Sequence, residues 1–335
     1  MSKRVLATGG TGYIGSHTVI ELINAGYTVD IIDNLFNSKE SVLDKIEEIT
    51  GTRPGFFKVD LLDREKLENI FKENQYDSVI HFAGLKAVAE SVEKPLDYYH
   101  NNLTGTINLL QIMQKYDVKE IIFSSSATVY GDQGQSEYNE SMTTGISLTN
   151  PYGRTKYFIE EILKDLATSD PDFKVSILRY FNPIGAHPSV LIGEDPNGIP
   201  NNLMPIIMRV SEGKIKELQV YGDDYPTKDG TCRRDYIHVV DLAKGHLASL
   251  EKLENGVKIY NLGTGVPTSV KEMIVAFEEA SGEKLPHVIA GRRAGDLAEL
   301  YANAEKALEE LGWKTELTVA DAMRDTINYL KNHAA

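Results

Sequence analysis

Tyr152 and Lys156 are the pair of residues in this 335-residue chain whose spacing most directly suggests chemistry. The preceding Thr149-Asn150-Pro151 is a typical helix start, with a polar capping residue and a proline in the first turn. Side chains four residues apart lie on one helix face, so the phenol and the ammonium would point into the same space. An ammonium about 4 Å away, at an effective dielectric of about 20, would lower the phenol's pKa from about 10 to about 7. Such a phenol could exchange protons with an alcohol. An ordinary helix with an exposed lysine and a packed tyrosine would carry the same pair, so the rest of the chain must decide.

A glycine-rich turn near the N-terminus indicates a dinucleotide site. The apolar run Arg4–Thr8 predicts a buried strand, and Thr28–Ile32 predicts a second strand that ends at Asp33. Between them stand Gly9, Gly12 and Gly15 and a predicted helix over residues 16–25. In this context, closely spaced glycines let the backbone approach a pyrophosphate at the helix N-terminus. A purely structural turn would not explain the acid at the end of the second strand.

Asp33 also indicates which dinucleotide binds. A carboxylate accepts hydrogen bonds from a ribose diol and repels a 2′-phosphate, and no arginine follows it immediately, which favours NAD over NADP. Asp60 and Leu61, after the next predicted strand, are expected near the adenine edge. The cofactor residues predicted around this turn are Gly9, Gly12, Tyr13, Ile14, Gly15, Asp33, Asn34, Leu35, Phe36, Asn37, Ser38, Asp60 and Leu61.

Strands and helices alternate through the first 180 residues. The expected helices cover residues 16–25, 41–50, 64–74 and 95–116. The expected strands cover residues 4–8, 28–32, 55–59, 78–82, 120–123, which runs into Ser124–Ser126, and 174–180. This alternation predicts an α/β fold with a doubly wound, parallel, Rossmann-type sheet. Ligands of such sheets bind beyond the carboxyl ends of the strands. The candidate residues fall at those ends: Gly9–Gly15, Asp33, Asp60, Phe82–Lys86 and Ser124–Ser126.

The chain changes character after Tyr180. Residues 182–202 contain four prolines and are expected to form a long, irregular, functional segment. Expected helices follow over residues 203–212, 239–253, 269–280, 304–311 and 319–332, with strands over 218–222 and 258–262. We expect residues 1–181 to form an NAD-binding domain onto which residues 239–265 pack back. Residues 182–335 would mainly form a smaller C-terminal α/β lobe for the substrate.

Composition and charge argue against several classes of binding partner and of site. The formal net charge is −14, which argues against non-specific binding to nucleic acid or to an anionic membrane. Cys232 is the single cysteine and the histidines lack metal-ligand spacing, so we expect neither a disulfide within the chain nor a metal site. No apolar run approaches the roughly 20 residues that span a bilayer, and the first residues do not resemble a signal peptide. We therefore expect a soluble, cytoplasmic protein.

Ser126 joins the tyrosine and lysine in a recognisable set. A serine at the end of a strand, together with Tyr152, Lys156 and a nucleotide fold, resembles the short-chain dehydrogenase/reductase family. The chain resembles the extended, nucleotide-sugar branch of that family in three segments, Ser124–Gly131, Arg179–Pro183 and Arg234–Val239. Similarity to the 4-epimerases that interconvert UDP-glucose and UDP-galactose is carried by Phe82–Val88, Ala186–Pro188 and Gly198–Pro205.

This resemblance implies a mechanism with NAD as the cofactor. Tyr152 would take the proton of the sugar's 4-hydroxyl, Ser126 would bond the same oxygen, and Lys156 would bond the nicotinamide ribose and lower the phenol's pKa. The hydride of C4 would pass to NAD and return to the other face of a 4-keto sugar, so NAD would stay bound without net oxidation. The place implied for this activity is galactose metabolism.

The resemblance also implies binding residues. Further cofactor contacts would be Phe82, Ala83, Gly84, Lys86, Asn101, Ser126, Tyr152, Lys156 and Phe181. The UDP-sugar would meet Lys86, Ser126, Tyr152, Asn182, Asn202, Leu203, Gln219, Val220, Tyr221, Arg234, Arg293, Asp296 and Leu300. Arg234 and Arg293 would neutralise the diphosphate, because guanidinium forks suit phosphate oxygens. Asp296 would bind the uridine ribose.

Two features of this resemblance concern specificity and assembly. Leu300 aligns with a position of the sugar pocket where an aromatic residue excludes a 2-N-acetyl group and a small residue admits it. Leucine is intermediate, so acceptance of UDP-N-acetylglucosamine or UDP-N-acetylgalactosamine stays open. Family members commonly form homodimers through the helices that correspond here to residues 95–116 and 152–166.

Two other classes of protein on this fold differ from the sequence at identifiable residues. A nucleotide-sugar 4,6-dehydratase would carry an Asp-Glu pair directly after the serine, where this chain has Ala127-Thr128; a nucleotide-sugar decarboxylase belongs to the same group of alternatives. A non-catalytic, NAD-sensing regulator on the same fold would lack the tyrosine and lysine pair.

Overall fold

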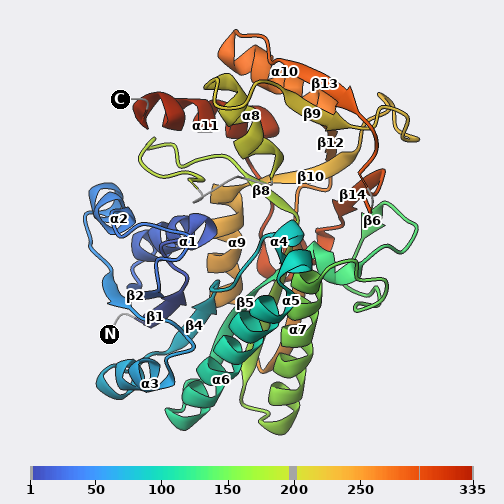
Figure 1. Ribbon diagram of the computed structural model, residues 1–335. Helices are drawn as coiled ribbons and strands as arrows, with labels where there is room; N and C mark the ends of the chain where they lie inside the picture. The colour runs from blue at the N-terminus through green and yellow to red at the C-terminus, as the bar shows by residue number, and fades with distance from the viewer. Residues whose placement is uncertain (1–2, 196–201, 294, 334–335) are drawn as a thin grey trace.

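The computed structural model describes residues 3–195, 202–293 and 295–333. Its largest element is a seven-stranded sheet in the order β11-β7-β5-β4-β1-β2-β3, and each neighbouring pair is parallel (Figure 1). The predicted parallel, doubly wound sheet is confirmed. Its strands are β1 (Arg4–Thr8), β2 (Thr28–Asp33), β3 (Gly55–Lys58), β4 (Ser78–His81), β5 (Glu120–Ser126), β7 (Lys174–Tyr180) and β11 (Gly256–Leu262).

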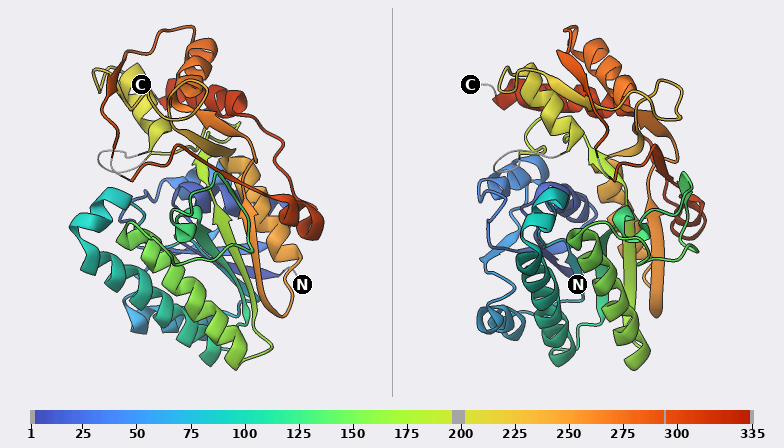
Figure 2. Two further views of the ribbon diagram at one scale, coloured as in Figure 1. Left: turned by 90° about the vertical axis from the view of Figure 1, so that its right-hand side faces the viewer. Right: turned by 45° about the vertical axis from the view of Figure 1, so that its right-hand side comes forward.

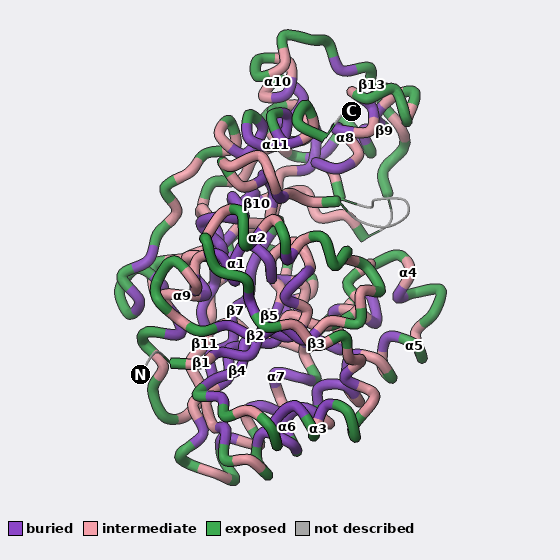
Figure 3. Tube along the Cα trace, turned by 90° about the vertical axis from the view of Figure 1, so that its left-hand side faces the viewer, coloured by how far each residue is buried: buried purple, intermediate pink, exposed green. Residues whose placement is uncertain are grey.

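Helices cover both faces of this sheet because successive strand side chains point to opposite sides. On β1, Val5 and Ala7 pack in one apolar cluster with α1, α2 and α9, whereas Leu6 packs in another with α3, α6 and α7. Figure 3 shows the resulting buried layer along the strands. The helices around the sheet are α1 (Tyr13–Asn24), α2 (Val42–Thr50), α3 (Arg64–Glu73), α4 (Val88–Glu93), α5 (Pro95–Tyr99), α6 (Gly105–Lys115), α7 (Pro151–Ser169) and α9 (Val239–Glu251).

A smaller lobe lies above the large sheet in the view of Figure 1. One of its sheets has the order β12-β10-β14-β6, with β8 also paired to β10, and the other consists of β13 and β9. Its helices bury an apolar cluster rich in methionine, including Met204, Met273 and Met323. The elements are β6 (Glu137–Tyr138), β8 (Asn182–Ile184), β9 (Leu218–Tyr221), β10 (Arg233–His238), β12 (Pro267–Ser269), β13 (His287–Ala290), β14 (Glu299–Ala302), α8 (Leu203–Ser211), α10 (Val270–Ser281) and α11 (Val319–His333).

Two elements from the second half of the chain belong to the large sheet. Strand β11 pairs with β7 from Gly256 opposite Lys174 to Leu262 opposite Tyr180. Helix α9 packs against α1, and both contribute to one apolar cluster. The chain therefore leaves the half of the molecule that contains the large sheet, here called the nucleotide half after its predicted role, and returns to it before it ends in the lobe.

Several elements differ from the sequence prediction. The helix expected over residues 95–116 is broken into α5, a π-helical turn (His100–Thr104) and α6, and the expected helix over 304–311 is largely a π-helical turn (Ala307–Leu311). Helix α4, a 3₁₀ turn (Ala127–Tyr130) and the strands β6, β8, β10, β12, β13 and β14 were not predicted. These strands are short and several are polar, so their pairing depends on tertiary contacts rather than on local pattern.

The predicted irregular segment over residues 182–202 lies partly within the described residues. Residues 182–184 of that segment form β8, while residues 196–201, which include Gly198–Asn201 of the quoted motif, lie outside the described residues. Of the helices that are described, none is both long enough and apolar enough to cross a membrane.

Candidate active site

Helix α7 begins where the sequence predicts and presents Tyr152 and Lys156 toward β5. The side chain of Asn150 caps the helix by accepting a hydrogen bond from the Gly153 amide at 2.8 Å, and Pro151 occupies the first turn. Lys156 is buried and Tyr152 is half-buried. The cap therefore fixes the turn on which both candidate side chains stand.

Ser126 ends β5 beside this turn. Its Oγ accepts hydrogen bonds from the Thr128 amide at 3.2 Å and from the Thr128 hydroxyl at 3.0 Å. Burial raises the pKa of Tyr152 above its ordinary value, and a hydrogen bond with Ser126 acts in the opposite direction. The two hydroxyl groups of the predicted set are thus neighbours.

The Lys156 ammonium lies beside Tyr152 but bonds a backbone carbonyl. Its Nζ donates to the Ser124 carbonyl at 2.6 Å and lies 5.9 Å from the centre of the Tyr152 ring. Burial lowers the pKa of Lys156 to about 8, while the charge of Glu160 opposes that shift. The direction of the Tyr152 shift is therefore opposite to the one expected from the sequence, because burial raises the pKa of the phenol and the Lys156 ammonium is turned onto a backbone carbonyl.

The glycine turn fits a dinucleotide phosphate. A Cβ on Gly15 would lie 2.4 Å from the Gly9 carbonyl oxygen, and Gly9 itself has a φ of +72° with Ala83 directly against it. Helix α1 then starts at Gly12 without a side-chain cap and without an acid in its first turn. A helix N-terminus of this kind, reached by a backbone without side chains in the way, suits an anionic pyrophosphate.

Asp33 and Asp60 stand at the ends of β2 and β3, where an adenosine would lie. The Asp33 carboxylate accepts from the Leu35 amide at 2.9 Å, from the Ser38 hydroxyl at 3.2 Å and from the Thr11 amide at 3.3 Å. These bonds orient the carboxylate, and its oxygens keep lone pairs for a ribose diol. The Asp60 carboxylate accepts from Asn34 Nδ2 and from the Leu62 amide, both at 2.8 Å. The side chain of Phe36 in the same loop is 67% exposed.

Asn102, which sequence reasoning missed, links the loop after β4 to α7 by hydrogen bonds. Its Oδ1 accepts from the Leu85 amide at 2.8 Å, and its Nδ2 donates at 3.0 Å to both the Leu85 carbonyl and Thr155 Oγ1. The predicted Asn101 donates to the same Oδ1 at 3.0 Å. Both residues lie in the π-helical turn, a feature often found at functional sites, and nothing in the sequence pattern indicates where that helix changes its pitch.

Across from the nucleotide half, the lobe gathers five predicted substrate residues. Strand pairing places Arg234 of β10 opposite Leu300 of β14. Arg293 binds the Asp296 carboxylate at 2.8 and 3.1 Å and lies over the Tyr221 ring at 5.6 Å. Arg234 Nη2 lies 3.7 Å from Asp296 and Arg234 Nη1 donates to the Leu297 carbonyl at 2.7 Å. Two guanidinium groups are thus held around one carboxylate.

Glu194 is a second residue that sequence reasoning missed. Its Oε1 lies 3.5 Å from both Lys86 Nζ and Asn202 Nδ2, so it links a predicted residue of the nucleotide half to one that caps α8. The hydroxyl of Tyr13 donates to the Gly185 carbonyl at 2.6 Å, and burial together with Glu194 raises the pKa of this phenol.

The remaining predicted residues occupy varied surroundings. Asn182 begins β8 and Gln219 lies on β9, both exposed, and Leu203 is the first residue of α8. Val220 is buried in the apolar cluster of the lobe, so only its backbone can face a ligand. Phe181 is buried beside the 3₁₀ turn after Ser126, and Phe82 packs on the His246 ring with ring centres 4.9 Å apart.

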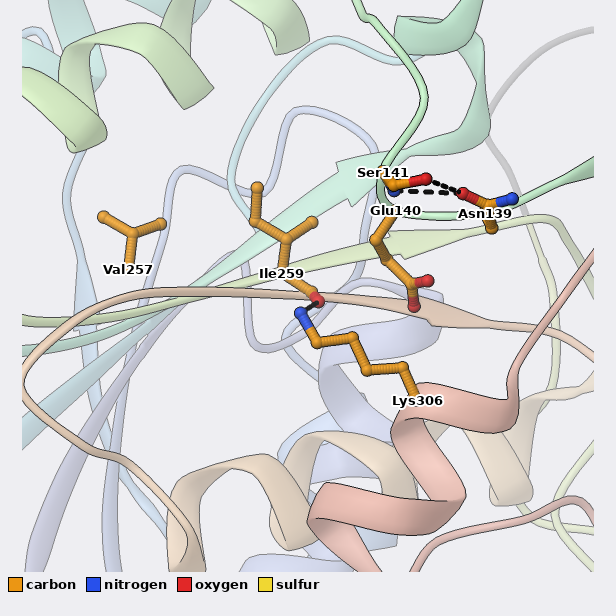
Figure 4. A pocket seen from close by; sticks show the side chains of 6 residues that line it. All are labelled: Asn139, Glu140, Ser141, Val257, Ile259 and Lys306. Carbon is orange, nitrogen blue, oxygen red and sulfur yellow. Dashed lines mark hydrogen bonds between the residues drawn. The ribbon is translucent and has the colours of Figure 1, made fainter.

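A separate hollow lies at the outer edge of β11. It encloses about 370 Å³ and is lined by Asn139, Glu140, Ser141, Val257, Ile259 and Lys306 (Figure 4). Lys306 Nζ donates to the Ile259 carbonyl at 2.9 Å, and Glu140 accepts from the Asn261 amide at 2.7 Å. These charged side chains are hydrogen-bonded to backbone groups of β11, and such bonds at an edge strand commonly protect it against further strand pairing.

In the described residues, no group of three or more His, Cys, Asp or Glu side chains is arranged to hold a metal ion.

Comparison with known proteins gives a consistent result. The NAD dependent epimerase/dehydratase family matches residues 5–263. A UDP-glucose 4-epimerase of Bacillus subtilis is 56% identical over 324 residues, which cover 96% of this chain and 95% of that protein. UDP-glucose 4-epimerase 2 of Arabidopsis thaliana is 54% identical over 339 residues, which cover 99% of this chain and 96% of that protein.

The fold agrees with these relatives. The crystal structure of UDP-glucose 4-epimerase from Bifidobacterium longum in complex with NAD+ and UDP has a TM-score of 0.95, with 52% identity over 99% of each chain. The resemblance drawn from the sequence motifs is confirmed. The chain belongs to the NAD dependent epimerase/dehydratase family.

Proposed function

We propose that this protein interconverts UDP-glucose and UDP-galactose by inverting C4 of the hexose, with NAD held tightly throughout. The observation that carries the proposal is the meeting of Ser126, Tyr152 and buried Lys156 at the end of β5. The glycine turn with Asp33 accounts for the cofactor, and the relatives' names account for the substrate. We place this activity in the cytoplasm and in galactose metabolism.

Tyr152 moves the proton in this scheme. Its phenolate oxygen takes the proton of the 4-hydroxyl while Ser126 Oγ, oriented by Thr128, bonds the same oxygen. Bound NAD would supply a hydride acceptor and donor for C4 and, in its oxidised form, a positive charge. Because burial holds the pKa of Tyr152 high, positive charge near the phenol is needed to create the phenolate. Tyr152 then returns the proton to the 4-oxygen of the product.

Arg234 and Arg293 hold the UDP part of the substrate. In an acidic chain, an anionic diphosphate needs specific cations, and these two guanidinium groups already lie together at Asp296. A diphosphate would share Arg293 with Asp296 or replace that carboxylate, and Asp296 would then face the ribose hydroxyls. Tyr221 and Gln219 of β9 flank the uracil in this arrangement. Lys86 and Asn202, joined through Glu194, would approach from the opposite side.

The direct test of this proposal uses purified protein without added cofactor. Released NAD should be present after denaturation, and UDP-galactose should become UDP-glucose in an assay coupled to UDP-glucose dehydrogenase. Protein that carries no NAD and gains no activity when NAD is added would overturn the proposal.

A second candidate function is epimerisation of UDP-N-acetyl sugars as well, and Leu300 decides it. This half-buried side chain lies on β14 against the apolar cluster that includes Phe181 and the turn after Ser126. We expect Leu300→Ala to raise the ratio of kcat/KM for UDP-N-acetylglucosamine over UDP-glucose by about tenfold or more, and Leu300→Tyr to lower it. Both ratios are measured by product analysis of the two reactions run in parallel, and equal ratios in the three proteins would contradict a gating role.

We also propose a homodimer formed by the outward faces of α5, α6 and α7. Figure 2 shows α6 and α7 side by side along the outside of the sheet. Apolar side chains there are exposed: Leu96 by 78% and Phe158 by 41%, with Val88 and Val92 close by in the sequence. An apolar surface of this kind supports pairing with a second copy.

Leu96→Lys is expected to shift this protein from dimer to monomer, because a desolvated ammonium would face its own copy across a two-fold axis. Analytical ultracentrifugation at several concentrations measures the change. Val275→Lys, an exposed substitution on α10 of the lobe, is the matched control and should leave the mass unchanged. A wild-type protein that sediments as a monomer would refute the dimer.

A further inference from the structure

A buried ion pair lies one helical turn beyond Lys156. Arg179 of β7 donates from Nε to Glu160 Oε1 at 3.0 Å and from Nη2 to Glu160 Oε2 at 2.6 Å. Ser125 Oγ donates to the same Oε1 at 2.5 Å. Glu160 is fully buried and Arg179 is 1% exposed, and neither has a place in the proton transfer proposed above.

The pair is joined to the site through β5. In the chain, Ser125 lies between Ser124 and Ser126, and the Ser124 carbonyl accepts the hydrogen bond from Lys156 Nζ. Glu160 follows Lys156 by four residues, which puts both side chains on one face of α7. The Glu160 carboxylate is therefore hydrogen-bonded to β5 and β7. The Lys156 ammonium, one helical turn earlier on α7, bonds near the carboxyl end of β5.

Stability alone gives little reason for this pair. A buried ion pair roughly balances its own desolvation, and well-packed apolar residues in its place are often neutral or stabilising. Three charges are buried together here, on Lys156, Glu160 and Arg179. Without the carboxylate, two cations would remain in a low dielectric, and of these only the lysine can release its proton, because an arginine stays charged.

The other groups that face Lys156 supply no negative charge. On β5 it meets the Ser124 carbonyl and the ring of Phe123, whose centre is 4.9 Å from Nζ. On β4 lies His81, whose pKa is lowered to about 3 by burial and by Lys156, so its imidazole is neutral.

Two phenols complete the surroundings and are neutral as well. Burial raises the pKa of Tyr152 on the same helix and that of Tyr180 on β7, whose hydroxyl bonds the Ser124 hydroxyl. Glu160 is the charged group that raises the pKa of Lys156 against the effect of burial.

We propose that Glu160 is a positioning residue for the epimerase site: its carboxylate, fixed by Arg179 and Ser125, keeps the buried Lys156 protonated and extended to the end of β5. This inference rests on the proposed function only in taking the Lys156 ammonium to be part of the epimerase site. Arg179 acts one step further away, as the group that holds the carboxylate in place.

The titration of Lys156 tests this role without any turnover. Protein labelled with ¹³C at lysine Cε is titrated by NMR, and the Lys156 resonance is assigned by its absence in Lys156→Met. In Glu160→Gln we expect Lys156 to lose its proton about one to two pH units lower than in the wild type, as follows from removing a buried negative charge one helical turn away. Glu160→Asp, which keeps the charge, should restore much of the difference. Ser125→Ala should leave the titration near that of the wild type, since it removes one hydrogen bond and no charge.

Folding is controlled by a second variant. Glu160→Gln leaves Arg179 unpaired, so Glu160→Gln/Arg179→Met is measured in parallel. It should unfold thermally near the wild-type temperature and show a smaller downward shift, because the repelling guanidinium is removed together with the carboxylate. A Lys156 titration unchanged in folded Glu160→Gln overturns the proposal, as does a downward shift in the double variant larger than that in Glu160→Gln. Failure of both variants and Glu160→Asp to fold overturns it too, because the pair would then serve the fold. Failure of the wild type to epimerise UDP-galactose would instead refute the proposed function and leave the Lys156 titration readable.

Discussion

Replacing Tyr152 by phenylalanine is expected to lower kcat for UDP-galactose epimerisation by about 10²- to 10⁴-fold, the range for loss of a general acid–base group. The ring stays, so packing at the start of α7 and the capping by Asn150 should be preserved. NAD should remain bound and KM should change little, because the phenolic oxygen acts on the proton of the 4-hydroxyl. The measurement is the coupled assay together with the NAD content of the purified variant.

Tyr157→Phe is the matched control for this variant. Tyr157 lies on the same helix, its ring packs near Phe158 and Gly145, and it has no part in the proposed proton transfer. It should keep most of the wild-type rate. If Tyr152→Phe kept full activity while Tyr157→Phe lost it, the assignment of the proton-transfer group would be wrong.

Gly15→Ala is expected to weaken NAD binding by about 5- to 150-fold. The added Cβ would lie 2.4 Å from the Gly9 carbonyl oxygen and 2.9 Å from Gly10 Cα, and both contacts are backbone. Forcing a methyl group into such a turn costs about 1–3 kcal/mol, and each 1.4 kcal/mol is about tenfold in affinity. The turn must open to relieve the contact, and opening it moves the amides that would face the pyrophosphate. NAD retained after gel filtration measures the effect.

Gly291→Ala provides the comparison for this substitution. A Cβ at Gly291 would meet no other atom within 4 Å, and its φ is not in the positive region. NAD retention should equal that of the wild type. Full NAD retention by folded Gly15→Ala would argue against a pyrophosphate at this turn.

The nucleotide half was predictable because its signals are local. Gly9, Gly15 and Asp33 lie within two adjoining strands and one helix, so chain order alone brings them together. The start of α7 was equally readable from Asn150 and Pro151. Alternation of apolar strands with helices gave the parallel sheet for the same reason.

The lobe and the electrostatics of the site were less accessible from the sequence. Arg234 reaches Leu300 and Asp296 through pairing of β10 with β14, which no local pattern indicates. The pKa of Tyr152 moves opposite to the sequence prediction, because the pattern shows a neighbouring charge but does not show the burial. Asn102 acts from a π-helical turn inside what reads as one continuous helix.

The fate of the hydrogen at C4 tests the account most directly. UDP-galactose labelled with deuterium at C4 is incubated with the protein in ordinary water, without added cofactor, and the UDP-glucose formed is examined by NMR and mass spectrometry. Because the proposed site transfers that hydrogen to bound NAD and returns it while Tyr152 handles only the hydroxyl proton, the product should keep the deuterium at C4. Product that has exchanged this deuterium with solvent, or formed only when reductant is supplied, would contradict the account.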